Sequence, residues 1–476
     1  NGALASNGLL HVTSGASLVT FGTVSGTGYQ IDRTTTFDTN TGRYSIVGSP
    51  IANANFTTLG ANAVIYGYDQ SELYDPTGNE GLGRFKTPAT LGITEMAVGK
   101  GYFSAFTGDA NGLVEFTGTP NTGTINVALA FTDHGPAEEA AYEGFNLVSN
   151  PYPSAIDFTG FMTANNSNIN GSIYLWDDNN SNTARGDNAD YVIVNALGNT
   201  DSRSNGLTKW DGYIRSGQGF FVQNTAVTNL TFNNSMRILS NNDDGGFYRT
   251  TKVSNSIKLT LSDDKTQKAA IVGFAQDATI GYDKAYDATN LSASQLQLYS
   301  LQAEGSDKLG IQGLPQGYKE QIQLGFSTPT RGDYTISIAN VSELQDMEVV
   351  LLKDLLLGKT VNLKDESYSF TTTGAENQDR FTLQVAPSIV SSIDQLQEEV
   401  FYSYSTEGKL NVVFQTAGFE QADFRLIDMT GQIIHHELVN IQSNKWQMST
   451  NDIPEQVYIL MISTDHGVWK RRVITR

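Results

Sequence analysis

Hydrophobic and polar residues alternate over short stretches along most of the chain. Clear examples are "SIKLTLSD" (256–263), "YTISIAN" (334–340) and "RFTLQVA" (380–386). Because successive side chains of a β-strand point to opposite faces, this spacing predicts strands with one face in a core and the other in solvent. Gly, Asn, Asp and Pro residues separate such stretches, as expected for tight turns. We therefore predict an all-β fold.

The first 250 residues contain a degenerate internal repeat, which is visible when the sequence is compared with itself. The matching segments are "RYSIVGSPIANANF" (43–56) with "GFNLVSNPYPSAIDF" (144–158), "VIYGYD" (64–69) with "SIYLWDD" (172–178), "VGKGYFSAF" (98–106) with "SGQGFFVQN" (216–224), and "LVEFTG" from Leu113 with "LTFNNS" from Leu230. We expect two related β units, in which the Ile-Tyr pairs at 65–66 and 173–174 lie on matching strands.

These patterns divide the chain into tandem β-sandwich-like domains that end in a small immunoglobulin-like domain. The predicted segments are the end of a β-rich repeat array (1–42), a first repeat unit (43–140), a second repeat unit (141–250), a β-sandwich with two sheets (251–387), a linker (388–399) and the C-terminal domain (400–476). The linker follows Pro387 and has no clean periodicity. The C-terminal domain holds about seven predicted strands, enough for a small sandwich.

Two adjacent aromatic residues, Phe220 and Phe221, lie in the repeat segment "QGFFVQN". On a strand they would point to opposite faces, and Gly219 before them would permit close packing. We favour packing in a core, because the flanking pattern is that of ordinary strands. A platform on which carbohydrate rings stack is the functional alternative.

Composition narrows the chemistry that the chain can perform. Its 476 residues are 39% hydrophobic, which is enough for several cores, and none is cysteine. Disulfides, thiolate metal sites and cysteine nucleophiles are therefore excluded. The formal net charge of −20 argues against a nucleic-acid partner, because phosphate binding needs clustered Lys and Arg. No apolar run reaches the roughly 18 residues of a membrane helix, so no transmembrane segment is predicted.

The C-terminus departs from this acidic character, because residues 470–476 hold four basic residues and no acidic one. Lys470 and Arg472 alternate with Arg471, so both faces of a strand would carry charge, which disfavours a central strand. An edge strand that offers a basic surface and unpaired backbone to a partner fits better. The alternative is that these charges only discourage aggregation.

The segments around this strand resemble a known family. "IDMTGQII", "NDIPEQVYILMIS", "DHG" and "WKRRVIT" follow one another as in the type A C-terminal sorting domain of the type IX secretion system of Bacteroidota. The resemblance covers 400–476 and departs from the family at Gln456, where the family usually has Gly before "VYIL".

The resemblance implies that this domain is an export signal, which acts after the protein has entered the periplasm. It also implies three partners: an outer-membrane β-barrel shuttle protein that binds the domain, the type IX translocon, and a sortase that cuts in the preceding linker and attaches the cargo to the surface. The protein is then expected at the cell surface or outside the cell. The residues expected to contact the shuttle are Gly467, Trp469, Lys470, Arg471, Arg472 and Arg476.

The rest of the chain contains few of the residues that usually form catalytic sites. Of the five histidines, only His11 and His134 precede the C-terminal domain, and they are far apart in the sequence. A Ser-His-Asp triad or a histidine metal site is therefore not predicted. Paired carboxylates such as Asp243 and Asp244 lie in Asn- and Gly-rich loops, where solvated acids are expected. We predict that the chain is not an enzyme.

One acidic loop has the composition of a metal site. "WDDNNSNTARGDNAD" (176–190) contains Asp177, Asp178, Asp187 and Asp190 among oxygen-bearing Asn, Ser and Thr side chains. Calcium prefers oxygen ligands, so these four aspartates are candidate calcium ligands. The loop lacks the Gly and the terminal Glu of an EF-hand, and a solvated polar loop is the alternative. No other cofactor is predicted.

Three functions of the body fit these observations. It could be an adhesin or glycan-binding module with surface glycans as partners, a set of accessory β domains of a secreted hydrolase whose catalytic domain lies upstream of residue 1, or a structural stalk. The stretch "NGLLHVTSGASLVT" (7–20) resembles the last rungs of a longer β-rich array, and no initiator Met or signal peptide is present. We therefore expect a longer exported precursor, whose sequence would separate the three.

Overall fold

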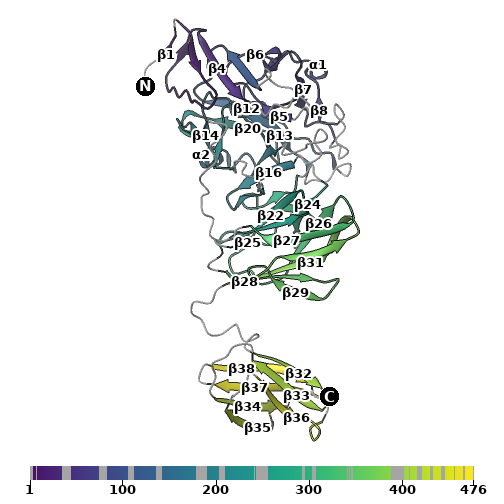
Figure 1. Ribbon diagram of the computed structural model, residues 1–476. Helices are drawn as coiled ribbons and strands as arrows, with labels where there is room; N and C mark the ends of the chain where they lie inside the picture. Colours follow the sequence, from purple (N-terminus) through teal and green to yellow (C-terminus); the bar gives the residue numbers. More distant parts are fainter. Residues whose placement is uncertain are drawn as a thin grey trace. The chain divides into compact units, whose positions relative to one another are not determined.

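The computed structural model divides the chain into two compact units, Asn1–Ser388 and Ile389–Arg476 (Figure 1). β-Strands make up most of the described elements in both units, which confirms the all-β prediction. The residues that the structure describes are 4–6, 8–34, 44–73, 83–105, 112–135, 142–177, 190–202, 210–240, 242, 256–291, 295–302, 307–339, 341, 344, 347–387, 401–406, 408–414, 421–428, 432–440, 445–454, 456–464 and 467–474. The predicted boundaries near 42, 140 and 250 fall inside the first unit and stay predictions, and the predicted linker, 388–399, lies outside the described residues.

The N-terminal segment, together with β11 of the first repeat, forms two small sheets that include parallel pairs. β1 pairs with β3, and β4 lies between β2 and β11. Their bounds are β1 (Leu4–Ala5), β2 (Leu10–Val12), β3 (Val24–Ser25), β4 (Tyr29–Thr34) and β11 (Leu113–Thr117). Ile31 of β4 and Phe116 of β11 are buried in a cluster that also contains Ile51 and Tyr102 of the first repeat. The N-terminal segment and the first repeat therefore share a core.

The internal repeat predicted from the sequence is confirmed by two sheets with the same strand order. The first repeat has the order β5–β10–β7–β8, and the second has β13–β19–β15–β16, extended by β17. The elements of the first repeat are β5 (Tyr44–Val47), β6 (Ala54–Asn55), η1 (Phe56–Leu59), β7 (Val64–Tyr68), β8 (Phe85–Lys86), α1 (Pro88–Leu91), β9 (Glu95–Met96) and β10 (Tyr102–Ala105). Those of the second are β12 (Ile125–Leu129), β13 (Phe145–Ser149), β14 (Ile156–Asp157), α2 (Phe158–Asn165), β15 (Ile173–Asp177), β16 (Asp190–Asn195), β17 (Gly198–Asn199), β18 (Tyr213–Ile214), β19 (Gly219–Gln223), β20 (Thr228–Phe232) and η4 (Asn234–Met236).

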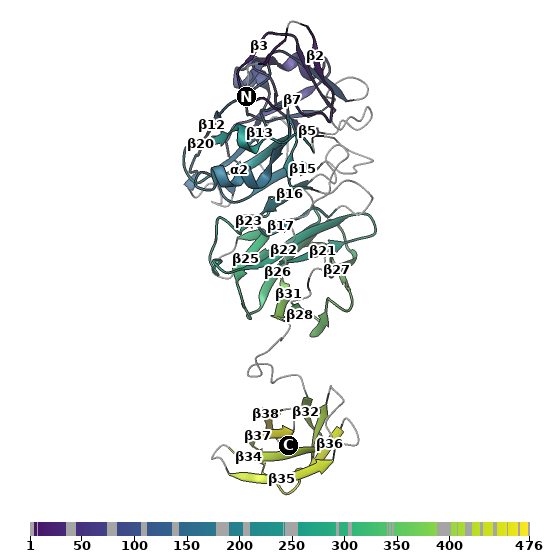
Figure 2. The same ribbon diagram turned by 90° about the vertical axis from the view of Figure 1, so that its left-hand side faces the viewer.

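Equivalent residues of the two repeats also keep the same register. Tyr66 lies opposite Phe103 in the first repeat, and Tyr174 lies opposite Phe221 in the second. The Ile-Tyr pairs at 65–66 and 173–174 therefore occupy matching strands, as predicted. In the second repeat, α2 packs on β20 (Figure 2), with the rings of Phe161 and Phe232 5.4 Å apart.

Each repeat places a capped helix directly after a short strand. The side chain of Asn55 accepts a hydrogen bond from the N–H of Thr57 at the start of η1, and Asp157 accepts one from the N–H of Gly160 at the start of α2. Such caps satisfy N–H groups that have no partner within the helix. The strands β6 and β14, which pair with β9 and β18, directly precede the two helices in equivalent places.

One of the predicted matches is displaced by a residue. In β11 the buried positions are Val114 and Phe116, whereas in β20 they are Leu230 and Phe232. Because burial alternates along a strand, Val114 and not Leu113 is the counterpart of Leu230. Both members of the aligned pair are leucines, which is why sequence identity favoured the wrong register.

The two repeats contact each other through equivalent positions. The N–H of Gly48 donates to the carbonyl of Gly217 at 2.8 Å, and the N–H of Ser149 donates to the carbonyl of Gly99 at 2.9 Å. In the aligned sequences Ser149 is the counterpart of Gly48, and Gly217 is the counterpart of Gly99. A contact in which equivalent residues exchange roles is that of a two-fold dimer, so the repeats are related by an approximate two-fold axis.

A glycine at this contact leads to a prediction for stability. A Cβ atom on Gly219 would lie 2.1 Å from Cγ2 and 2.9 Å from Cβ of Ile46 in the other repeat. Gly219→Ala is therefore expected to force β5 and β19 apart and to lower the free energy of unfolding by about 1–3 kcal/mol. Chemical denaturation of the full chain measures this. In the control Gly281→Ala the new Cβ would meet only Thr279 Oγ1, at 3.6 Å, and an equal loss there would contradict the prediction.

The rest of the first unit is one 11-stranded sheet, with the order β29–β28–β31–β26–β24–β25–β22–β21–β27–β30 and β23 paired to β25. The bounds are β21 (Ser256–Ser262), β22 (Gln267–Ala275), β23 (Ala288–Thr289), β24 (Gln297–Leu301), β25 (Lys308–Pro315), β26 (Ile322–Thr328), β27 (Gly332–Ile338), β28 (Met347–Asp354), β29 (Lys359–Asn362), β30 (Tyr368–Thr372) and β31 (Ala375–Pro387). The sequence predicted two separate sheets here.

This sheet curls so that its strands surround one core. Phe370 of the end strand β30 lies 4.8 Å from Phe381 of β31 and 5.3 Å from Phe326 of β26, measured between ring centroids. The pairing of β26 with β31 shifts register between Leu324 and Phe326. Irregularities of this kind bend a strand and increase its twist, which lets a single sheet close around its own side chains.

The C-terminal unit is a seven-stranded sandwich within the described residues, as predicted (Figure 1). Its sheets are β32–β33–β36 and β35–β34–β37–β38, with bounds β32 (Phe401–Thr406), β33 (Lys409–Phe414), β34 (Gln421–Ile427), β35 (Ile433–Asn440), β36 (Lys445–Ser449), β37 (Val457–Thr464) and β38 (Gly467–Ile474). Buried residues of both sheets form one cluster, in which the ring of Trp446 stacks on Phe424 at 4.1 Å.

Candidate functional site

The hairpin at the C-terminus lies at one edge of the four-stranded sheet. β38 pairs with β37 from Val457–Ile474 to Thr464–Gly467 and is the last strand of that sheet. In the described part of the chain no strand pairs with its other side. The prediction of an edge strand is therefore confirmed. Such an edge leaves backbone N–H and C=O groups for a partner strand.

The register of this hairpin places its basic positions on both faces of the sheet, the core face and the outer face. Arg471 lies opposite Leu460, which is fully buried, so position 471 is on the face of the sheet that turns to the core. Lys470 lies opposite the half-buried Met461, and Arg472 is on the same outer face. Basic positions on both faces were predicted, and the register assigns 470 and 472 to the outer one.

The other candidate residues lie along the same hairpin. Trp469 is opposite the buried Ile462, and Gly467 is opposite Thr464 at the turn end of the pair. Val473, between the basic positions and the C-terminus, is buried in the core of the unit. Arg476 lies outside the described residues. The structure thus brings positions 467–472 onto one edge strand.

The opposite edge of this sheet carries a feature that the sequence analysis missed. β35 exposes three apolar side chains, with exposed fractions of 49% for Ile433, 37% for Ile434 and 61% for Leu438. The available signal was the run "IIHH", which breaks the alternation of a half-buried strand. The C-terminal unit therefore has a basic edge and an edge with exposed apolar residues.

An ion-pair cluster joins β35 to β34. Arg425 Nη2 lies 2.6 Å from Asp423 Oδ2, and His436 Nε2 lies 2.8 Å from Asp423 Oδ1. Burial of Asp423 opposes its ionisation, but the hydrogen bond and charge of Arg425 and the nearby His436 outweigh it and lower the pKa of the carboxyl. The cluster is accessible to solvent on this edge, so it contributes little to stability.

The predicted calcium loop is only partly described. Asp177 and Asp190 lie opposite each other at the ends of β15 and β16, whereas Asp178 and Asp187 lie outside the described residues. Among the described residues no group of three or more His, Asp or Glu side chains could hold a metal ion. The four aspartates stay predicted calcium ligands.

The aromatic pair of the second repeat is buried in two different cores. Phe220 packs in a cluster with Phe161, and Phe221 packs on the other face of β19 with Phe103 and Phe145. The interpretation of core packing is confirmed, and the alternative of a carbohydrate platform at these two residues is wrong. Because β19 is covered on both faces, neither ring can meet a ligand.

The two histidines of the body lie in different surroundings. His11 Nε2 is 2.6 Å from Asp32 Oδ2 on the N-terminal sheet, beside Gln30 of β4. The backbone N–H of His134 donates to Glu143 at 2.8 Å. These contacts hold β2 to β4 and the segment after β12 to the residues that precede β13.

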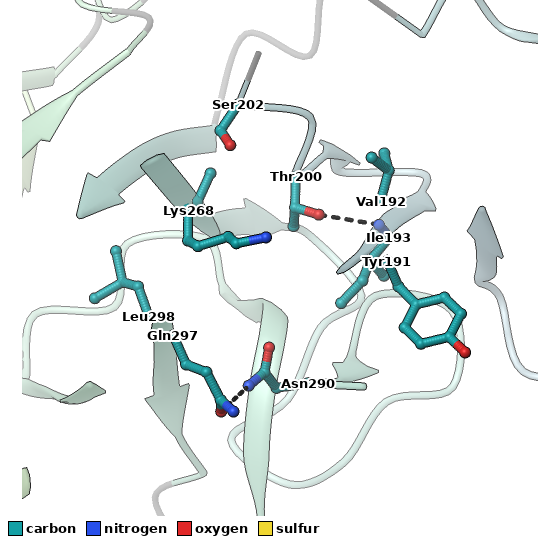
Figure 3. A pocket seen from close by; sticks show the side chains of 10 residues that line it. Tyr191, Val192, Ile193, Thr200, Ser202, Lys268, Asn290, Gln297 and Leu298 are labelled. Carbon is teal, nitrogen blue, oxygen red and sulfur yellow. Dashed lines mark hydrogen bonds between the residues drawn. The ribbon is translucent and has the colours of Figure 1, made fainter. Parts of the chain in front are cut away.

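A small polar cavity lies between the second repeat and the eleven-stranded sheet. Figure 3 shows the side chain of Lys268 extending between Thr200 on one side and Asn290 and Gln297 on the other. Thr200 accepts a hydrogen bond from the N–H of Ile193 at 2.9 Å, and Asn290 donates to Gln297 at 3.2 Å. Its volume of about 30 Å³ suits one or two water molecules and is too small for an organic ligand.

Comparison with family models now identifies both parts of the chain. A model described as Domain of unknown function (DUF8693) matches residues 3–385. The chain belongs to this family. A model described as Secretion system C-terminal sorting domain matches residues 406–476, the unit that carries the basic edge strand. No curated protein matches the chain.

The sorting domain makes this DUF8693 protein a cargo of the type IX secretion system, as the resemblance implied. The protein is thus directed across the outer membrane to the cell surface or the medium, and its sorting domain interacts with the secretion machinery. Among the described residues no helix is long and apolar enough to span a bilayer. Membership of DUF8693 groups the body with similar proteins and assigns it no activity.

Proposed function

We propose that this protein is an adhesin or glycan-binding module, whose body, residues 1–387, binds surface molecules without transforming them. The observation that carries the proposal is the sorting domain, because it delivers the body to the outside of the cell, where glycans are abundant ligands. The body supplies rigid sheets that share cores from the N-terminal segment to the eleven-stranded sheet. Rigid sheets hold a binding surface in one shape, which reduces the entropy lost on binding.

We assign the contact with the shuttle to the sorting domain's edge strand. A β-barrel shuttle would bind along β38, because an edge strand can pair with a strand of a partner. The outer-face positions Lys470 and Arg472 would add electrostatic attraction. The translocon would then move the bound cargo, and a sortase would cut within 388–399.

The charge of the protein favours neutral ligands for the body. With a formal net charge of −20, the chain repels acidic polysaccharides and nucleic acids over long range. Neutral glycans experience no such repulsion. We therefore expect neutral surface glycans to be the ligands of the body.

The proposal is tested by probing an array of neutral and acidic glycans with the purified full chain. We expect saturable binding to a subset of neutral glycans, and no product when the bound glycans are incubated with the protein. Absence of binding to any glycan would favour the structural stalk. Release of sugars, lost on changing one carboxylate, would show a hydrolase, and a catalytic domain upstream of residue 1 in the precursor would favour the accessory-domain alternative.

A further inference from the structure

A larger pocket lies within the eleven-stranded sheet itself. Its volume of about 320 Å³ is roughly ten times that of the cavity beside Lys268 and lies in the range of small-ligand sites. Residues at the end of β24, in β25, in the turn that follows β25, and at the start of β26 line it. Four of them are glutamines: Gln302, Gln312, Gln321 and Gln323.

Gln312 is the most informative of these residues. It is 3% exposed, and its Nε2 donates a long hydrogen bond, 3.4 Å, to the carbonyl of Leu301. Its Oε1 is buried and has no hydrogen-bond partner in the described structure. An unpaired buried acceptor costs about 1–3 kcal/mol, which a ligand that donates to it would recover.

Gln323 also lines the pocket, next to Ile322 in β26. Its Nε2 donates to the carbonyls of Gln378 at 2.6 Å and Phe381 at 3.1 Å. Both amide hydrogens are therefore committed within the chain, and the amide oxygen is the group that can serve a ligand. The half-buried Gln302 and the exposed Gln321 add amides that can both donate and accept.

Apolar side chains complete the pocket. Leu314 and Ile322 are buried in the core cluster, and the ring of the half-buried Tyr318 packs against that cluster. None of the described residues that line the pocket is charged. The site thus combines neutral donors and acceptors with an apolar wall and an aromatic ring.

We propose that this pocket binds a neutral sugar residue of a surface glycan, an inference that rests on the proposed function. A sugar hydroxyl both donates and accepts, as an amide does, and a sugar ring has an apolar face suited to Tyr318. A phosphate or carboxylate ligand would find no countercharge in the lining. An extended peptide could not add to the sheet here, because β24, β25 and β26 each pair with a strand on both sides.

Two variants of the full chain test the site against the best glycan of the array, by calorimetric titration. Gln312→Leu removes the unpaired acceptor and should weaken binding about tenfold. Tyr318→Ala should weaken it about three- to tenfold. Gln316→Leu, in the exposed turn and outside the lining, is the matched control and should bind as the unaltered protein does.

Thermal unfolding shows whether the side chain of Gln312 serves ligand binding or the stability of the fold. Replacing an unsatisfied buried amide by an apolar side chain of similar shape is neutral or stabilising, so Gln312→Leu should keep or raise the melting temperature while it lowers affinity. Unchanged glycan affinity in both pocket variants would overturn this site and leave the proposed function intact. A failure of the unaltered chain to bind any glycan would overturn the proposed function. Binding of peptides alone, or of acidic glycans alone, would overturn the sugar class.

Discussion

A chain that ends at Gly467 is expected to accumulate in the periplasm instead of outside the cell. The truncation removes all but the first residue of β38, and with it the edge backbone and the buried Val473. Losing even 1.4 kcal/mol of interaction with the shuttle weakens binding about tenfold, so the exported fraction should fall by at least that factor. The ratio of extracellular to periplasmic protein measures the effect, and normal secretion of the truncated chain would show that the hairpin does not carry the signal.

Because truncation also disturbs the core, a second variant separates recognition from folding. Lys470→Gln combined with Arg472→Gln changes only positions on the outer face of β38. Positions on the outer face do not enter the core of the unit, so the stability of the sorting domain should be kept while export falls several-fold. The control Lys409→Gln with Lys445→Gln makes the same change in charge at exposed positions of the other sheet. Equal export of both double variants would contradict a role for the basic edge.

Local pattern was sufficient to predict the repeat and the edge strand. The Ile-Tyr pairs at 65–66 and 173–174 lie in segments whose turns and apolar positions recur in order, and in the structure these pairs occupy matching strands in the same register. The position of β38 followed from charge on both faces of a strand, which a central strand does not tolerate.

The closure of the eleven-stranded sheet could not be predicted in this way. The contact of Phe370 with Phe381 and Phe326 depends on how far the sheet twists along its whole length. Alternation along one strand reports which side chains are buried and not which strands they meet. The alternation of buried and exposed residues along each strand is therefore the same in two separate sheets and in one curled sheet.

The candidate sugar site was missed for a related reason. In "GIQGLPQGYKEQIQ" (310–323) the glutamines have the pattern of polar turn and strand residues. Only the fold shows that Gln312 is buried with an unpaired oxygen and that the amide hydrogens of Gln323 are already committed. Burial of a polar side chain depends on neighbours distant in sequence, which a single sequence does not identify.

The eleven-stranded sheet also contains a buried ion pair, whose acidic residue lies in an apolar run of the sequence. In "VVLLKDLLLG" (349–358), Lys353 and Asp354 interrupt an apolar run. Asp354 is 1% exposed, and its Oδ2 accepts hydrogen bonds from Arg380 Nη2 at 2.8 Å and Nε at 3.1 Å. Tyr368 donates to the same oxygen at 2.9 Å, and Oδ1 accepts from the turn that joins β28 to β29.

Asp354→Ala is expected to lower the free energy of unfolding by about 3–5 kcal/mol, because it leaves the buried guanidinium of Arg380 without its counter-ion. Adding Arg380→Met should restore part of this loss, since an apolar pair avoids the desolvation of the charge. Hydrogen exchange of peptides from β28 and β31 in the full chain measures both changes. Asp264→Ala, in an exposed turn, should change stability by less than about 0.5 kcal/mol.

Asp354 also makes the stability of the protein depend on pH. Burial of Asp354 opposes its ionisation, but hydrogen bonds from Arg380, Tyr368 and the turn outweigh it and lower the pKa of the carboxyl below its ordinary 3.8. The unfolded chain therefore takes up the proton first as the pH falls, so this stabilisation is complete above the ordinary pKa and is lost through the lower, folded pKa. Between pH 5 and pH 3, about two units around that value, the unaltered protein should lose more stability than Asp354→Ala does. Parallel losses in the two proteins would show that the pair does not titrate with folding.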